Sequence, residues 1–149
     1  MAIDVQNNIL FLLDNDAEGV DACVRIKRLG LPANMRVTCL PELAEFEGFP
    51  CRGPNGIQPS DINRRAAAIE CYLDLVAPGQ AAAEVRWTNF KANSGVYQGA
   101  LQNKESYTKF FLNQTKEKLT DGSYDSTKIS QVLDRIFSVC CDIAFRTNA

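Results

Sequence analysis

The pattern of apolar residues changes early in the chain, from a continuous run at residues 9–13 to helical spacing from Ala17 onward. Residues 9–13 read Ile-Leu-Phe-Leu-Leu, a short run typical of a strand buried on both faces. From Ala17 the apolar positions recur at helical spacing, and Gly30 and Pro32 end the pattern, which predicts a helix. Residues 35–40 contain β-branched side chains and predict a second strand. This β-α-β order predicts parallel strands and an α/β fold.

The next segments predict a loop and then a helix. Residues 41–60 carry four prolines and several glycine or asparagine turn positions, so we expect a long loop, a feature that is often functional. Residues 62–75 show helical spacing, with Ser60 or Asp61 as the N-cap and Pro78 after the end.

The second half of the chain predicts one more strand and two helices. A strand is expected at 85–88, a loop at 89–95, a helix at 97–118 and an amphipathic helix at 126–145. The expected architecture is a single domain over 1–149: a parallel sheet of three to four strands with flanking helices and a C-terminal helix. Its core spans about 9–112, and its C-terminal helical extension spans about 123–146.

Composition narrows the function classes. A length of 149 residues suits one domain, and an apolar fraction of 46% suits a globular protein. We expect no membrane span and no secretory signal, hence a cytoplasmic protein. The chain has no histidine, which excludes His-based triads and His-ligated zinc. With a net charge of −2, a nucleic-acid partner requires a local basic patch.

The six cysteines show no C-x-x-C pair and do not predict a metal or redox motif. Cys23, Cys71 and Cys140 lie in helical apolar patterns, where a free thiol behaves as a small core side chain. Buried thiols are consistent with the cytoplasmic expectation.

Candidate chemistry is concentrated directly after the first strand. Asp14, Asp16 and Glu18 lie within five residues, and like charges that close raise one another's pKa. A hard cation such as Mg²⁺ takes oxygen ligands and removes this repulsion, so these three are candidate metal ligands. Glu18 has an alternative interpretation as a first-turn charge that the helix dipole stabilises. Gly19 leaves room for a phosphate at the helix N-terminus.

Two families other than the one favoured below use similar strings. An EF-hand is rejected, because its twelfth position would be Arg25 instead of a bidentate Glu. A phosphatase of the haloacid-dehalogenase type, with Asp14 as nucleophile, stays open, although Glu18 replaces its usual Thr.

The string Asp14-Asn15-Asp16-Ala17-Glu18-Gly19 after an apolar strand matches the D-x-D-x-x-G signature of Toprim domains. Further stretches strengthen this likeness: Leu40–Leu43, Gly53–Gly56, Asp61–Asn63, Ala67–Leu73 and Tyr97–Leu101. Together they make most of residues 9–112 resemble HEPN/Toprim-associated proteins. The resemblance implies Mg²⁺- or Mn²⁺-dependent phosphodiester chemistry on DNA or RNA, with a role in bacterial defence.

The resemblance also shows a departure. Toprim domains place a catalytic Glu on an earlier strand, whereas the residues before Asp14 contain no Glu. Either a second protein chain or another copy of this chain would then supply the catalytic Glu, or Glu70 would take its place. The alternative interpretation of Glu70 is an ordinary solvent-exposed helix residue. Lys104 corresponds broadly to a lysine that stabilises phosphate charge in related nucleases, with Lys91 and Lys109 as competitors.

Basic and aromatic residues complete the candidate site. Arg52 lies in the Gly/Pro loop, and Arg64 and Arg65 begin an expected helix, where cations are disfavoured unless an anion binds. All three are candidate phosphate ligands; an ordinary exposed pair is the alternative for the latter two. Phe90 and Tyr97 are candidate base-stacking residues.

Two main hypotheses result. The first is a metal-dependent nuclease-like enzyme, and the second is a metal- or nucleic-acid-binding module that lacks a complete catalytic set and works in a larger assembly.

Overall fold

The computed structural model describes residues 8–92 and 94–147, and it begins with the expected β-α-β unit. Strand β1 (Ile9–Leu13), helix α1 (Ala17–Arg28) and strand β3 (Met35–Cys39) follow one another, and the two strands pair in parallel. Asp16 caps α1 by accepting a hydrogen bond from the Gly19 backbone N–H. The first strand, the first helix and the second strand of the sequence prediction are therefore confirmed in their positions. The expected burial of β1 on both faces is wrong, because Ile9 and Phe11 are exposed on one face.

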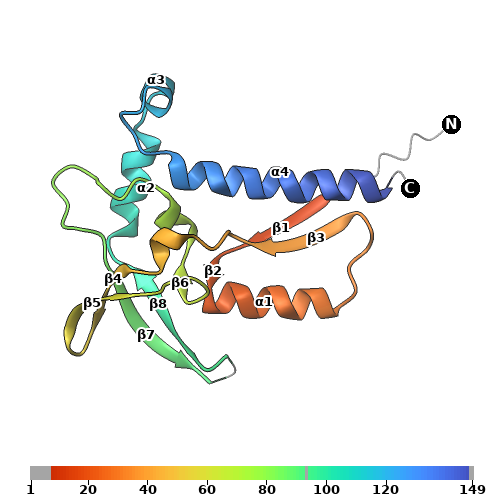
Figure 1. Cartoon of the computed structure of the whole chain (residues 1–149), viewed down its shortest axis with the longest axis horizontal. Helices are drawn as coiled ribbons and strands as arrows, with labels where there is room; N and C mark the ends of the chain where they lie inside the picture. Colours follow the sequence, from red (N-terminus) through yellow and green to blue (C-terminus); the bar gives the residue numbers. More distant parts are fainter. Residues whose placement is uncertain (1–7, 93, 148–149) are drawn as a thin grey trace.

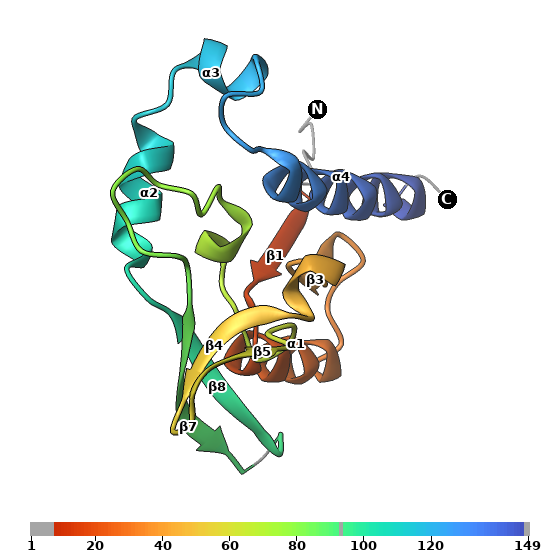
Figure 2. The same ribbon diagram turned by 60° about the vertical axis from the view of Figure 1, so that its left-hand side comes forward.

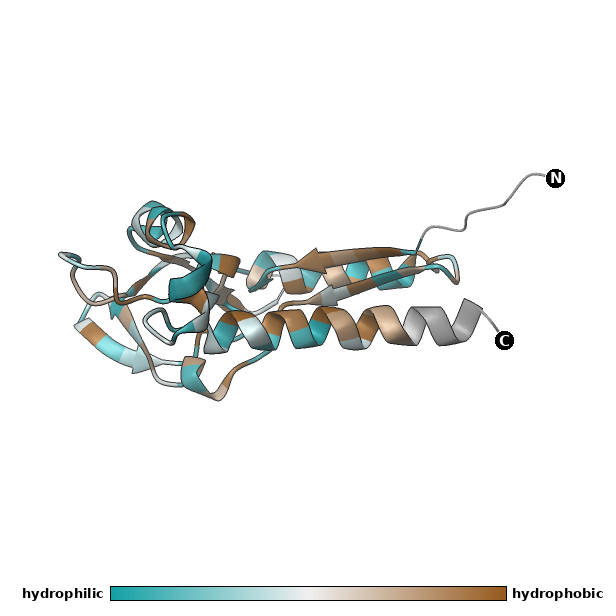
Figure 3. Cartoon of the chain, turned by 90° about the horizontal axis from the view of Figure 1, so that it is seen from above, coloured by the Kyte–Doolittle hydropathy of each residue, from teal (hydrophilic) through white to brown (hydrophobic). Residues whose placement is uncertain are grey.

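The long C-terminal helix α4 (Thr127–Thr147) covers the opposite side of the β1–β3 pair from α1 (Figures 1 and 2). Val132 is buried on α4, and Arg135 donates a hydrogen bond to the Thr38 hydroxyl of β3 at 3.0 Å. Figure 3 shows apolar and polar segments alternating along α4, as its sequence predicts. Cys140 of α4 is exposed, so its expected place in the core is wrong.

A second sheet contains four strands in the order β5-β4-β7-β8. Their bounds are β4 (Phe49–Gly53), β5 (Gly56–Ser60), β7 (Val85–Lys91) and β8 (Val96–Leu101). Only β4 and β7 run parallel, and the other two neighbouring pairs are antiparallel. The expected parallel sheet of three to four strands is therefore wrong. The fold is mixed α/β with a C-terminal helix, and its purely parallel sheet has two strands.

The expected long loop at 41–60 contains the β4–β5 hairpin, preceded by the 3₁₀ helix η1 (Ala44–Phe46). Pro50 and Pro59 face each other across this hairpin. Strand β5 lies at the edge of the sheet, where a residue without an N–H is tolerated. Pro50 lies in β4, outside the two residues, Cys51 and Arg52, that pair with β7. The segment is therefore a hairpin and not the expected irregular loop.

The helix expected at 62–75 is wrong. Strand β6 (Ala66–Ala67) pairs antiparallel with β2 (Asn15–Asp16), and the 3₁₀ helix η2 (Ile69–Tyr72) follows. Asp61 therefore caps no helix; its side chain accepts from the Asn63 backbone and side chain instead. This segment is buried on several sides by other elements, and that burial satisfies its apolar residues without helical periodicity.

The helix expected at 97–118 is also wrong, because the segment divides into β8, α2 (Lys104–Leu112) and α3 (Lys116–Thr120). Strand β8 packs so closely that a Cβ on Gly99 would lie 2.7 Å from Val85 Cγ1. Helix α2 begins after Asn103, whose φ is 54°.

The core gathers around Phe46, Ile62, Tyr72, Val85 and Tyr107, all buried. It joins the four-stranded sheet to η1, η2, α2 and α4. None of the helices within the described residues is long and apolar enough to cross a membrane.

Candidate functional site

Three carboxylates line one shallow pocket of about 380 Å³ at the carboxyl end of β1. They are Asp14, Asp16 and Glu18, and Arg25 of α1 forms part of the same wall. The sequence prediction that these acidic side chains gather at the strand end therefore agrees with the pocket lining. Their individual partners differ, and the partners determine which oxygens remain for a ligand.

Asp14 is half-buried, and its Oδ1 accepts a hydrogen bond from the Ile69 backbone N–H at 3.0 Å. Burial raises the pKa of the Asp14 carboxyl above its ordinary value, and the charges of Asp16 and Glu70 act in the same direction. The Ile69 hydrogen bond and, more weakly, the Lys104 charge lower the pKa. Asp14 thus lies within the electrostatic reach of both residues that the sequence proposed as its partners.

Glu70 and Lys104 come from different elements, η2 and the first turn of α2. The Lys104 Nζ lies 3.7 Å from Glu70 Oε1, with the lysine side chain 54% exposed and the glutamate side chain 20% exposed. The charges of this ion pair act on Asp14. The helix expected to carry Glu70 is absent, whereas Lys104 lies on α2, a shorter helix than the one expected.

Both carboxylate oxygens of Asp16 have partners. Oδ1 accepts from the Gly19 N–H at 2.7 Å, and Oδ2 accepts from the side-chain amide of Gln98 at 2.8 Å. Glu18 forms an ion pair with Lys91, which lowers the pKa of this exposed carboxyl. Within the described residues, no group of three or more Cys, Asp or Glu side chains is arranged to hold a metal ion.

Gln98 is a residue that sequence reasoning missed, because the segment around it was expected to be helical. Strand β8 instead brings it to Asp16, and its Oε1 is buried without a hydrogen-bond partner in the part of the chain that the structure describes. A buried amide oxygen without a partner is costly and therefore points to a missing donor or cation. The motif Tyr97-Gln98-Gly99, noted in the sequence for another reason, was the available signal.

The arginines expected to bind phosphate lie at separate places. Arg52 is held by Glu84 in a bidentate pair, with N–O distances of 2.7 and 2.9 Å. Arg64 lies 3.4 Å from Glu42, and Arg65 forms a backbone bridge with Asp16. Neither Arg64 nor Arg65 begins a helix, so the expectation that a helix dipole disfavours their charges is wrong. Both nevertheless lie close to the carboxyl end of β1.

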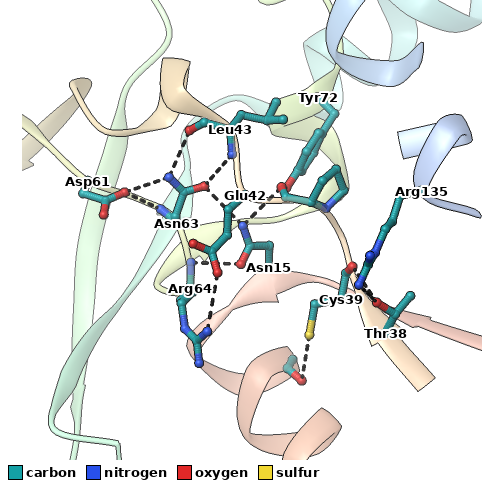
Figure 4. A network of polar contacts seen from close by, with 12 residues as sticks. Asn15, Thr38, Cys39, Glu42, Leu43, Asp61, Asn63, Arg64, Tyr72 and Arg135 are labelled. Atoms are coloured by element: carbon teal, nitrogen blue, oxygen red, sulfur yellow. Dashed lines mark hydrogen bonds and ion pairs between the residues drawn. The ribbon is translucent and has the colours of Figure 1, made fainter. Parts of the chain in front are cut away.

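A buried amide network fixes the loops around the strand end (Figure 4). The Asn15 Nδ2 donates to Asn63 Oδ1 at 3.3 Å, and Asn15 Oδ1 accepts from the Arg64 N–H at 3.0 Å. Asn63 also accepts from the Leu43 N–H and donates to the Leu43 carbonyl, each at 3.0 Å. These residues hold the candidate site in place and leave no free polar group of their own for a ligand.

The candidate stacking residues differ in exposure. Phe90 and Tyr97 face each other across the β7–β8 hairpin, with ring centroids 5.2 Å apart, and each is 56% exposed. Trp87 packs against the core.

Comparison of the chain with protein-family models, with curated proteins and with solved structures gave no significant match. The Toprim resemblance therefore stays an expectation from the sequence, and the geometry of the site carries the functional argument.

Proposed function

We propose that this protein performs metal-dependent phosphodiester chemistry on nucleic acid at the pocket after β1. The observation that carries the proposal is that Asp14, which lines the pocket, accepts a hydrogen bond from the Ile69 N–H, directly before Glu70, while Glu70 pairs with Lys104 of α2. A carboxyl with a raised pKa, a second acid and a lysine form a set that recurs at catalytic sites.

Mg²⁺ fits this pocket in a limited sense. The structure does not gather three acidic ligands, but Mg²⁺ is commonly held by one or two carboxylates, with waters and substrate phosphates completing its shell. Asp14 offers its Oδ2, which has no hydrogen-bond partner among the described residues. Asp16 is the second ligand in this proposal, with the orphaned Gln98 Oε1 nearby. The bound cation would neutralise phosphate charge and acidify a water.

The other residues act on the substrate. Lys104 is placed to stabilise charge that develops on the phosphate, a type of contribution that is often the largest in such sites. Glu70, held by the same lysine, is the candidate general base or acid in place of the Glu that Toprim domains carry earlier.

The test is cleavage of plasmid DNA, single-stranded DNA and RNA with Mg²⁺ or Mn²⁺. We expect Asp14→Asn, Glu70→Gln and Lys104→Met each to reduce cleavage by about 100-fold or more. Asp134→Asn, on the exposed face of α4, is the matched control and should cleave at the wild-type rate. Cleavage that is equal in all four variants would show that the activity is not that of this site.

A second function is favoured because both carboxylate oxygens of Asp16 already accept hydrogen bonds and Glu18 is paired with Lys91. In that case the chain is a metal- or nucleic-acid-binding module, and another chain in a larger assembly completes the site. It predicts that Mn²⁺ binding measured by calorimetry is lost in Asp14→Asn while no substrate is cleaved. Sustained cleavage by the purified wild-type chain would exclude this function.

A further inference from the structure

We infer that a groove beside α1 binds single-stranded nucleic acid, with its phosphates on arginines and its bases on the Phe90–Tyr97 pair. The groove has a volume of about 710 Å³ and is separate from the carboxylate pocket, although Arg25 lines both. This inference shares its partner with the proposed function but rests on different residues and requires no catalysis.

The charge of the groove is opposite to that of the whole chain. Four arginines line it, against two aspartates, on a protein whose formal net charge is −2. The arginines are Arg25, Arg28, Arg64 and Arg65, from α1 and from the segment before β6. Concentration of one sign of charge in a concave surface focuses the potential and attracts a polyanion.

Much of this positive charge is available. Within the described residues, neither Arg28 nor Arg65 forms an ion pair, and both are exposed. Arg25 pairs with Asp21 at 3.2 Å within α1, but both side chains are largely exposed. Exposed pairs of this kind contribute little free energy, so a phosphate can displace the aspartate.

Arg64 has a backbone conformation that does not favour arginine. Its φ is 61°, in the left-handed region that glycine and asparagine adopt at lower cost. The Asn15 side chain holds its N–H there, and its ion pair with Glu42 is exposed on both sides. Glycine would adopt this conformation at lower cost, and the arginine side chain that stands here instead lines the groove.

The aromatic pair lies at the end of a connected groove. Phe90 lines an adjoining pocket together with Arg25 and Ser94, and these last two residues also line the arginine groove. Phe90 and Tyr97 pack edge to face and remain more than half exposed. Exposed aromatic rings beside a basic groove suit unpaired bases, which have free faces, whereas the bases of a duplex are already stacked.

The experiment measures anisotropy of fluorescein-labelled oligothymidylate and oligouridylate in EDTA, so that the proposed metal site plays no part. We expect saturable binding with a log–log salt slope of about −2 to −3, from three or four phosphate contacts. Arg28→Ala/Arg65→Ala should weaken binding at least about tenfold and reduce the slope by about 1.4. Phe90→Ala/Tyr97→Ala should weaken binding by a similar factor without changing the slope.

The matched control is Lys116→Ala/Lys118→Ala on α3, which lies at the opposite end of the molecule from the β7–β8 hairpin (Figures 1 and 2). This variant removes the same charge and should bind as the wild type does. Circular dichroism and thermal unfolding establish that each variant is folded. Asp14→Asn should bind normally, which separates this inference from the proposed catalysis.

Several results would overturn the inference. The first is a loss of affinity in Lys116→Ala/Lys118→Ala equal to that in the arginine variant. The second is the absence of binding at low salt. The third is competition by polyglutamate that is as effective as competition by unlabelled oligonucleotide. Duplex DNA bound as tightly as single strands, with no effect of Phe90→Ala/Tyr97→Ala, would overturn the assignment of a single-stranded partner.

Discussion

Gly19 contacts the end of β1 so closely that a Cβ at this position would lie 2.2 Å from the carbonyl oxygen of Asp14. The glycine of the D-x-D-x-x-G string therefore has a structural reason here: it lets the first turn of α1 pack on the strand that carries the carboxylates. The sequence had assigned Gly19 to phosphate access. Close packing accounts for the glycine without any ligand.

Replacing Gly19 by alanine is expected to destabilise the protein by about 3 kcal/mol, because a backbone oxygen cannot rotate away as a flexible side chain can. Chemical unfolding in urea measures this loss. Gly48→Ala is the matched control, because a Cβ there would meet no atom within 4 Å. An equal stability of the two variants would show that the strand and helix can separate at little cost.

Asp14→Asn is expected to stabilise the fold at neutral pH. The folded-state pKa of Asp14 lies above its ordinary value of 3.8, so the folded chain retains this proton at a pH where the unfolded chain has released it. Stability therefore falls as the pH rises from about 4 through the folded-state pKa. Asparagine keeps an oxygen for the Ile69 N–H and carries no charge.

Thermal unfolding from pH 3 to pH 8 tests this expectation for Asp14. The melting temperature of Asp14→Asn should exceed that of the wild type at pH 7, by about 2–4 °C for each kcal/mol gained. The difference should shrink as the pH falls below 3.8 toward 3, where Asp14 becomes mostly neutral in both the folded and the unfolded chain. A variant that melts lower than the wild type at pH 7 would show that the carboxylate itself is stabilising.

Asn63→Leu is expected to cost about 3 kcal/mol or more. Leucine has a similar volume but leaves the N–H and carbonyl groups of Leu43 without their side-chain partners, each a buried polar group. Urea unfolding measures the loss, and Asp61→Ala is a milder comparison because Asp61 is exposed. If Asn63→Leu were as stable as the wild type, water would have to reach these groups.

The cysteines are expected to divide by reactivity. Cys140 and Cys141 are exposed on α4 and should react with Ellman's reagent first at pH 8. Burial raises the pKa of Cys39 and of Cys51 to about 11, so few of these thiols are ionised at that pH. Peptide mapping after brief iodoacetamide treatment identifies the labelled positions, and early labelling of Cys51 would contradict the described burial.

Local patterns in the sequence were enough to predict three elements. The apolar run 9–13, the periodic residues from Ala17 and the amphipathic stretch after Ser126 each carry a signal within a few turns, and the structure has β1, α1 and α4 there. The same local pattern placed Asp14, Asp16 and Glu18 together, because adjacency in the chain at a strand end brings side chains to one pocket.

The conformations of segments 62–75 and 97–118 depend on long-range packing that local patterns do not encode. Their apolar residues recur at a spacing that also suits a helix, but Ala66 pairs with Asp16, and Gly99 packs on Val85. Contacts between residues far apart in the chain outweigh local propensity in such buried segments. The same long-range pairing brings Gln98 to Asp16 and the Glu70–Lys104 pair to Asp14. The spacing of residues along the chain does not predict these contacts, because each depends on how two elements far apart in the sequence pack against each other.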